Sequence, residues 1–507
     1  MRSLLPFTAA SSLALFAAAP TLADVTAEQV WTNMRAPILA MGGQMEASAT
    51  RKDNRLEIGE TVIRLALPMG AGDVSITTSG MSLAENGDGT VALLHPAQMY
   101  ARFRVDGPQG LLAAAAMTMD GASYSATASG EAGDVTYAYS LGNGSFRLGE
   151  VNVPEAPDMQ IDMSGSMSGM QGTYRIQEGE LLTVTGEGGM GEMSFDVEMV
   201  DDLGISSTGR QVLSGGQSGF AMTIPAGKID LMNLAQGLRD GLAVKVTTEG
   251  ARLDSTTTST LDGELLAVQN YGYLTDSISY VLDASGLNAT GRNSDIWMEF
   301  QVAEALPIPI KATAGAMEGA LVMPLNATEG TGPFTLNTMI ENLAIDEALW
   351  AMIDPGAQLP RDPASLTLNL SGQIELLMDL LDLNRWMQMG PDAQSPVLLH
   401  GLTLDALRLD LAGLAVDGEG SFTFDNSDYD TFDGIPAPEG TLSLNASGVN
   451  GLIDNLIAMG LISAGEASGY RLMIGSVAVA GDGEDTLRSV IEVKPNGQIS
   501  ANGQRLR

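Results

Sequence analysis

The sequence predicts a mainly β protein, built on a large curved antiparallel sheet with a few amphipathic helices. Apolar and polar residues alternate with a period of two over much of the chain, as expected for strands with one buried face. Gly-containing turn pairs such as Asn86-Gly87, Asn143-Gly144 and Asn496-Gly497 separate these runs, and the chain contains 60 Gly. One-sided strands are typical of antiparallel sheets rather than of doubly wound parallel sheets.

The first 23 residues have the composition of a cleavable export signal. Arg2 precedes an apolar run from Leu4 to Ala19, and Thr21-Leu22-Ala23 places small residues before a cleavage point at Asp24. The run is too short and too weakly apolar for a spanning helix, which needs about 20 apolar residues. We therefore expect an exported, periplasmic protein whose signal is cleaved after Ala23.

The mature chain is expected to begin with a helix. Thr26 can cap this helix, and Gln29 stands at the capping-box position three residues later. Val30, Trp31, Met34 and Ile38 follow at near-helical spacing, and Gly42-Gly43 ends the pattern.

Strands are expected wherever the period changes to two. The clearest runs are Ala101–Val105, Met159–Met163, Met193–Met199, Ile278–Leu282 and Leu366–Leu370. In each of them the apolar side chains fall on one face, so the sheet should have one apolar face and one wet face.

Three segments have the pattern of a strand followed by Gly and then by an amphipathic helix. They begin at Phe220, Leu366 and Leu442, and the second predicts a broadly apolar helix near 373–388. We place a boundary near 225, which gives a region 24–225 and a region 226–507. Each region then starts with a helix followed by strands, as two similar halves would.

Charge and residue counts exclude several functional classes. The net charge of −37 repels nucleic acid, and the absence of Cys removes thiol chemistry and Cys-ligated metals. The two His residues, His95 and His400, stand far apart, so neither a triad nor a multi-His zinc site is expected. We predict no enzyme activity, no cofactor and no metal.

Two weaker motifs have structural interpretations. Gly186–Gly191 matches a dinucleotide-binding pattern, but a strand-like run follows it instead of a helix, so we interpret it as a hairpin turn. The acidic loop Asp425–Asp433 lacks the residue spacing of an EF-hand calcium site. Two interpretations of this loop remain, a solvated surface loop and a loose surface cation site. A glycoside hydrolase with two facing carboxylates remains an alternative, because 62 acidic residues allow many such pairs. Sugar-binding sites usually have aromatic side chains on which the sugar stacks, and the chain has only four Trp.

The C-terminal third resembles a known group of proteins. Asp354–Pro363, the unit Leu442–Ile457 and the final Asn502–Leu506 are similar to a domain-of-unknown-function family of exported proteins of Gram-negative bacteria. The resemblance implies that the protein is located in the periplasm and has no catalytic residues. More distantly, the strand and helix pattern is similar to periplasmic lipid-carrying β-groove proteins, an analogy of fold.

The leading prediction is a non-enzymatic protein of the cell envelope that binds or transports a lipid or another apolar ligand on its apolar sheet face. The alternative is a structural or interaction protein of the envelope with filled cores, an envelope protein partner and no ligand. Contact with a membrane surface is left open. The candidate groove residues are Met193, Phe195, Val197, Met199, Leu366, Leu368, Leu370, Ile374, Leu377, Met378 and Leu381.

Overall fold

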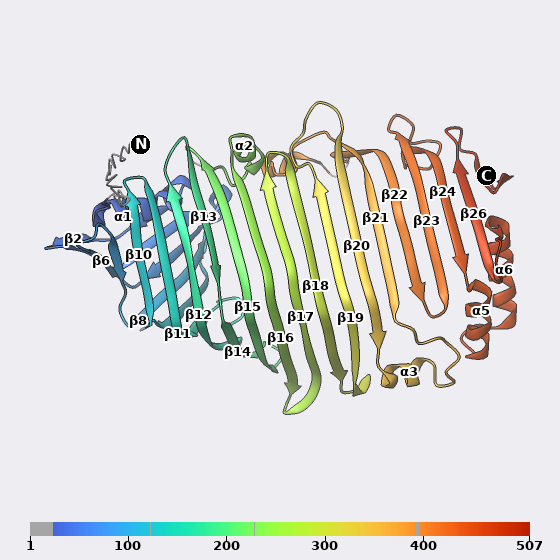
Figure 1. The fold of residues 1–507 in the computed structure, drawn as a ribbon, viewed down its shortest axis with the longest axis horizontal. Coiled ribbons are helices and arrows are strands. Elements are labelled where there is room, and N and C mark those ends of the chain that lie inside the picture. The colour runs from blue at the N-terminus through green and yellow to red at the C-terminus, as the bar shows by residue number, and fades with distance from the viewer. Residues whose placement is uncertain (1–23, 122, 228, 391–394) are drawn as a thin grey trace, which may run out of the picture.

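One antiparallel sheet of 28 strands runs the length of an elongated molecule (Figure 1). The computed structural model describes residues 24–507 apart from 122, 228 and 391–394, so the expected signal segment 1–23 lies outside the described residues. The predicted mainly β fold with a large antiparallel sheet and a few helices is confirmed.

The first strands along the chain come in collinear pairs. The chain completes one strand, breaks for a few residues and continues in the second, and both halves pair with the halves of the neighbouring strand. The pairs are β1 (Gln44–Glu46) with β2 (Ala49–Lys52), β3 (Arg55–Ile58) with β4 (Thr61–Ala66), β5 (Asp73–Thr78) with β6 (Met81–Glu85), β7 (Val91–Leu94) with β8 (Gln98–Gly107), and β9 (Gly110–Asp120) with β10 (Tyr124–Glu131).

The later strands are longer, and they continue the same up-and-down meander. One more collinear pair, β13 (Leu181–Gly189) and β14 (Glu192–Val200), lies between β12 and β15. The unbroken strands are β11 (Asp134–Asn152), β12 (Gln160–Gln177), β15 (Ile205–Pro225), β16 (Ala243–Leu261), β17 (Glu264–Asp283), β18 (Gly286–Val302), β19 (Leu306–Met323), β20 (Gly332–Ile345), β21 (Ala364–Leu376), β22 (Val397–Leu411), β23 (Leu414–Asp425), β24 (Ala437–Ser447) and β26 (Thr486–Val493), followed or flanked by the short β25 (Val479–Ala480), β27 (Ile499–Ala501) and β28 (Gln504–Arg505).

A line of irregular residues crosses the sheet at the level where the paired strands break. Gly216 in β15 and Gly250 in β16 lie opposite each other on this line, with φ values of 95° and 68° that glycine adopts without strain. Because bulges bend strands and increase their twist, the sheet folds along this line, which we call the crease. Further residues on it are Gly121, Gly142, Gly169, Asp276, Asp295, Gly315 and Asn342.

The crease divides the sheet into two wings, and helix α1 (Ala27–Ala40) lies between them at the N-terminal end. The helix contacts β1 on one wing and β3 and β6 on the other. Val30 and Trp31 join the main cluster of buried residues with Leu83 and Tyr137, on what we call the inner face of the sheet. The predicted Thr26 and Gln29 capping box is confirmed.

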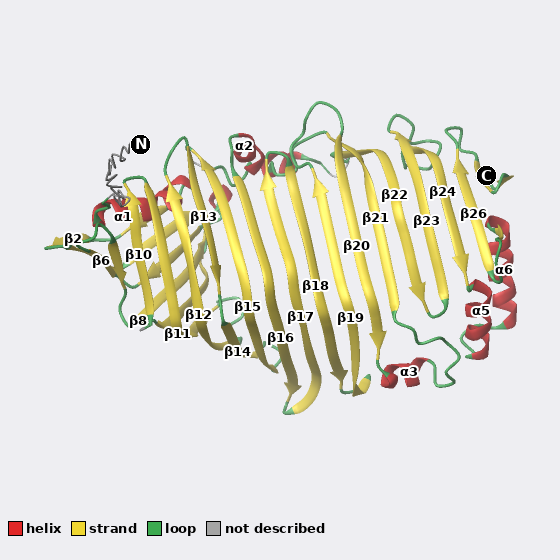
Figure 2. Cartoon of the chain, in the orientation of Figure 1, coloured by secondary structure: helices red, strands yellow, loops and turns green. Residues whose placement is uncertain are grey.

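The remaining helices lie at the rims and at the C-terminal end of the sheet (Figure 2). Their bounds are α2 (Leu234–Arg239), α3 (Glu347–Ile353), α4 (Leu383–Gln388), α5 (Val449–Ala458) and α6 (Ala464–Val477), and the short 3-10 helix η1 spans Pro68–Gly70. Among the helices in the described part of the chain, none has the length and apolar character needed to cross a membrane.

The helix expected near 373–388 is wrong for most of its length. β21 continues to Leu376, and Ile374 pairs with Gly332 and Leu399 on the neighbouring strands, so only Leu383–Gln388 is helical. The alternation of apolar residues continues through Gly372, and the sheet satisfies this period rather than the overlapping helical one. The strand, Gly and helix order is confirmed for the unit that begins at Leu442.

Two turn predictions are also wrong, because in both places the chain continues in the same direction across the crease instead of turning back. Gly186–Gly191 is no hairpin, because β13 and β14 run end to end and both pair with β12 and β15. Asn143-Gly144 lies inside β11, beside the crease. The expected division near 225 falls after β15, and this strand pairs along its length with β16, so the sheet continues across that position.

Candidate ligand-binding face

A row of apolar residues crosses the inner face from β11 to β26, and only Gly186 and Gly420 in it lack a side chain. Each member is the direct cross-strand partner of the next, so the row follows the register rather than chance alignment. It runs through Tyr137, Tyr174, Gly186, Phe220, Val246, Tyr280, Ala289, Leu321, Leu336, Leu370, Leu404, Gly420, Leu442 and Ile491. At about 4.8 Å per strand the row is about 60 Å long.

The adjacent row on the opposite, outer face has a different composition. It too follows the register, and Ser, Thr and charged residues dominate it. Its members are Thr136, Arg175, Thr185, Ala221, Lys245, Val281, Asn288, Val322, Thr335, Ser371, Thr403, Ser421, Thr441 and Glu492. The two faces therefore differ in polarity over the same strands, which is the pattern of a sheet that excludes water from one side.

The middle of the inner-face row remains exposed. Phe220 is 44% exposed, Val246 39% and Tyr280 52%, whereas Tyr137 under helix α1 is fully buried. The main helix contacts with the sheet are those of α1 at the N-terminal end, α3 at β19 and α5 at β23. Large apolar side chains that lie side by side without a cover mark an interaction surface more often than a solvated one.

The structure places the predicted residues of the 193–199 and 366–370 strands on this inner face. Met193 pairs with Leu213, and both line a hollow that also contains Phe220. Phe195 contacts Phe146 edge to face with ring centroids 5.5 Å apart, and alternation puts Val197 and Met199 on the same side of β14. Leu370 belongs to the inner row, and Leu366 and Leu368 share its face in β21.

The other four candidates, Ile374, Leu377, Met378 and Leu381, were expected on a helix that covers the groove, but they lie at the end of β21 and in the segment that follows it. Ile374 is 7% exposed at the end of β21, and Met378 is 5% exposed just after it. Leu377 is 44% exposed, and Leu381 is half-buried, in the segment that leads to α4. The hydrogen bond from Leu383 N to Met232 O (2.8 Å) holds this segment at the rim near α2, where Ile374 and Met378 are buried and Leu377 remains exposed.

Two adjoining hollows lie inside the crease, and we call them together the crease chamber. Their volumes are about 330 and 520 Å³, and they share Tyr139 and Met170. Sequence patterns did not single out most of the residues that line the chamber, although the high Met content of the chain, 28 of 507 residues, was a signal for it. The Met residues that line the chamber are Met99, Met119, Met167, Met170, Met190 and Met193. A larger and shallower hollow of about 860 Å³, on the outer face, has mainly Ser, Thr, Gln and Gly side chains.

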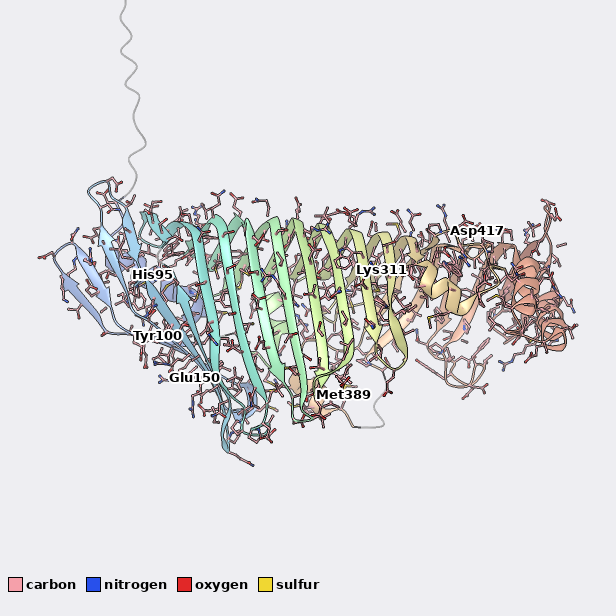
Figure 3. All side chains as sticks on the ribbon, turned by 90° about the horizontal axis from the view of Figure 1, so that it is seen from below. His95, Tyr100, Glu150, Lys311, Met389 and Asp417 are labelled. Atoms are coloured by element: carbon pink, nitrogen blue, oxygen red, sulfur yellow. The ribbon has the colours of Figure 1, made fainter. Side chains whose placement is uncertain are left out.

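Both His residues have structural surroundings. His95 lies near the N-terminal end of the sheet (Figure 3), packs edge to face on Tyr124 at 5.1 Å, and has its pKa lowered by burial, so it is neutral at pH 7. His400 Nε2 lies 2.8 Å from Glu375 Oε2 on the neighbouring strand. Within the described ranges, no group of three or more His, Asp or Glu side chains is arranged to hold a metal ion.

The carboxylates of the acidic loop bond to their own turns. Asp425 accepts bonds from Ser427 N (2.8 Å) and Oγ (2.6 Å), and Asp428 accepts bonds from Asp430 N and Thr431 N (3.0 Å each). Bonds from the Ser427 and Thr431 hydroxyls are the main cause that lowers the pKa of the two carboxyls.

Comparison of the chain with protein-family models finds no match, and comparison with curated proteins finds none either.

Proposed function

We propose that the protein is a non-enzymatic component of the cell envelope that binds a lipid or another apolar molecule on the inner face of its folded sheet. The observation that carries this proposal is the exposed middle of the inner-face row, from Phe220 to Leu336. Burying a fully exposed apolar side chain is worth about 1.5–3 kcal/mol, and covering one that is still about half exposed is worth roughly half of that. A hydrocarbon chain that covers several of these side chains therefore gains several kcal/mol.

The electrostatics of the inner row favour hydrocarbon over a charged ligand. The row that crosses the sheet from Tyr137 to Ile491 contains no Lys, Arg, Asp or Glu. Ion pairs lie along the outer side instead, such as Arg175 with Asp134 and Arg210 with Asp196 at 3.1 Å. A charged ligand would lose its hydration on the inner row without gaining a partner.

The test is lipid extraction and mass spectrometry of the protein purified from the periplasm. Neighbouring residues in β21 provide a matched pair of variants, because Leu368 faces inward and Asn369 faces outward. We expect lipid to co-purify with wild type and with Asn369→Arg, and the amount to fall at least fivefold with Leu368→Arg.

Wild-type protein that carries no lipid and takes up none when it is mixed with envelope lipids would overturn this proposal. The same result together with a specific protein bound to the inner face would favour the alternative of a structural or interaction protein.

A further inference from the structure

The crease chamber has the properties of a specific ligand site, beyond the general apolar character of the inner face. It draws its walls from both wings: Met99 and Met119 come from β8 and β9, and Tyr124 and Tyr174 come from the other wing. Its second part continues along the crease to Leu253 in β16 and Tyr273 in β17. At about 4.8 Å per strand, the distance from β9 to β17 is about 30 Å.

Glycine along the crease leaves room for this chamber. A Cβ at Gly121 would lie 2.4 Å from Met99 Cε, and one at Gly216 would lie 2.8 Å from the Cβ of Ala251. A side chain at either position would therefore take up space inside the chamber, which both glycines line. The volume of the two hollows falls within the range of about 300–1,000 Å³ that small-molecule sites occupy.

The lining defines the chemistry of the ligand. Met side chains are flexible and polarizable, so they suit a hydrocarbon chain of variable shape. No Lys or Arg is among the residues that line the two hollows. A ligand with an anionic head would lose its hydration there without gaining a counter-charge, whereas hydroxyl groups can bond to the Tyr and Ser side chains.

We propose that the crease chamber binds one molecule of an uncharged single-chain lipid, such as a monoacylglycerol, with its hydrocarbon chain lying along the crease. This inference rests on the proposed function, because it names the ligand class and the place where the chain lies. The hydrocarbon chain crosses β11, β12, the β13 and β14 pair, and β15 against Met170 and Met193, and the hydroxyl head lies near the polar groups of the lining.

Native mass spectrometry of the delipidated full chain tests the proposal, with monoolein and oleic acid as the two probes. We expect one monoolein per chain, bound at least tenfold more tightly than oleate at pH 8. Met170→Trp fills the chamber and should weaken monoolein binding at least tenfold. Gln171→Trp is the matched control, because the next residue of β12 points to the outer face and is exposed.

Further variants separate a filled chamber from a damaged fold. Met170→Leu keeps the side-chain volume and should retain binding, and Met193→Trp should repeat the loss at a second wall of the chamber. Thermal unfolding of each variant shows whether the fold survives the substitution. Oleate that binds as tightly as monoolein would overturn the choice of ligand class.

The failure of this inference differs from the failure of the proposed function. If Leu368→Arg weakens binding and Met170→Trp and Met193→Trp do not, the inner face binds lipid but the chamber is not the site. If wild-type protein binds neither probe and carries no envelope lipid, both proposals are wrong.

Discussion

The Tyr137 hydroxyl donates a hydrogen bond of 2.9 Å to Asn33 Oδ1, and both residues are completely buried. Asn33 Nδ2 in turn donates to Ile176 O at 3.3 Å and to Glu178 Oε1 at 3.0 Å. This network fixes helix α1 between the wings and closes the N-terminal end of the inner face.

Tyr137→Phe should lower the free energy of unfolding by about 1–3 kcal/mol, because it leaves the buried Asn33 oxygen without its donor. Urea unfolding measures the change. Tyr470→Phe, at a position 44% exposed on α6, is the control and should change stability little. Equal stability of Tyr137→Phe and wild type would show that the network does not hold the helix.

Stability should decrease above pH 10. Burial raises the pKa of Tyr137 and Tyr174 above the ordinary value of 10.0, so the unfolded chain releases these protons first. The stabilisation is complete below pH 10 and is lost as the pH rises towards the folded-state values, by about 1.4 kcal/mol per pH unit for each tyrosine. Removing one titrating group with Tyr137→Phe should make this slope shallower by that amount, which unfolding between pH 9 and 11 can measure.

Asp485 should contribute about 1–2 kcal/mol as the remote cap of α5. Gly448 occupies the N-cap without a side chain, and Asp485 accepts bonds from Asn450 N at 3.0 Å and Gly451 N at 2.8 Å. We expect Asp485→Ala to lower stability by this amount, measured by urea unfolding. Asp482→Ala, in the same loop and exposed, should have no such effect, and equal losses in the two variants would contradict the capping role.

Two glycines of the sheet should respond oppositely to alanine. Gly216 has a positive φ, and a Cβ added at this position would lie 2.8 Å from the Cβ of Ala251. We therefore expect Gly216→Ala to lower the melting temperature. Gly319 has no atoms within 4 Å of an added Cβ, and Gly319→Ala should be neutral or stabilise by about 0.4–1 kcal/mol. A Gly216→Ala protein as stable as wild type would show that the crease does not need this backbone geometry.

Local sequence signals predicted the elements well. The Thr26 and Gln29 capping box and the alternation in Met193–Met199 depend only on neighbouring residues, and both predictions are confirmed. The segment after Leu370 satisfied a strand period and a helix period at once, and pairing with β20 and β22 decided between them. Local pattern contains no information about that pairing.

The crease and the chamber could not be predicted from local patterns. Gly142 and Gly191 resemble turn residues in sequence, and only the register shows that they lie on one line across the sheet. The cap of α5 comes from Asp485, 35 positions after Asn450. Met193 was predicted for the ligand face, whereas its neighbours Met170 and Tyr139 follow from the tertiary fold.

The most direct test of the central claim is photo-crosslinking with a monoacylglycerol that has a diazirine in its hydrocarbon chain, followed by peptide mapping. Hydrocarbon bound on the inner face should label residues such as Met170, Phe220 and Leu253, and should spare outward residues such as Gln171 and Lys245. Labelling that is equal on both faces, or confined to the outer face, would contradict the account.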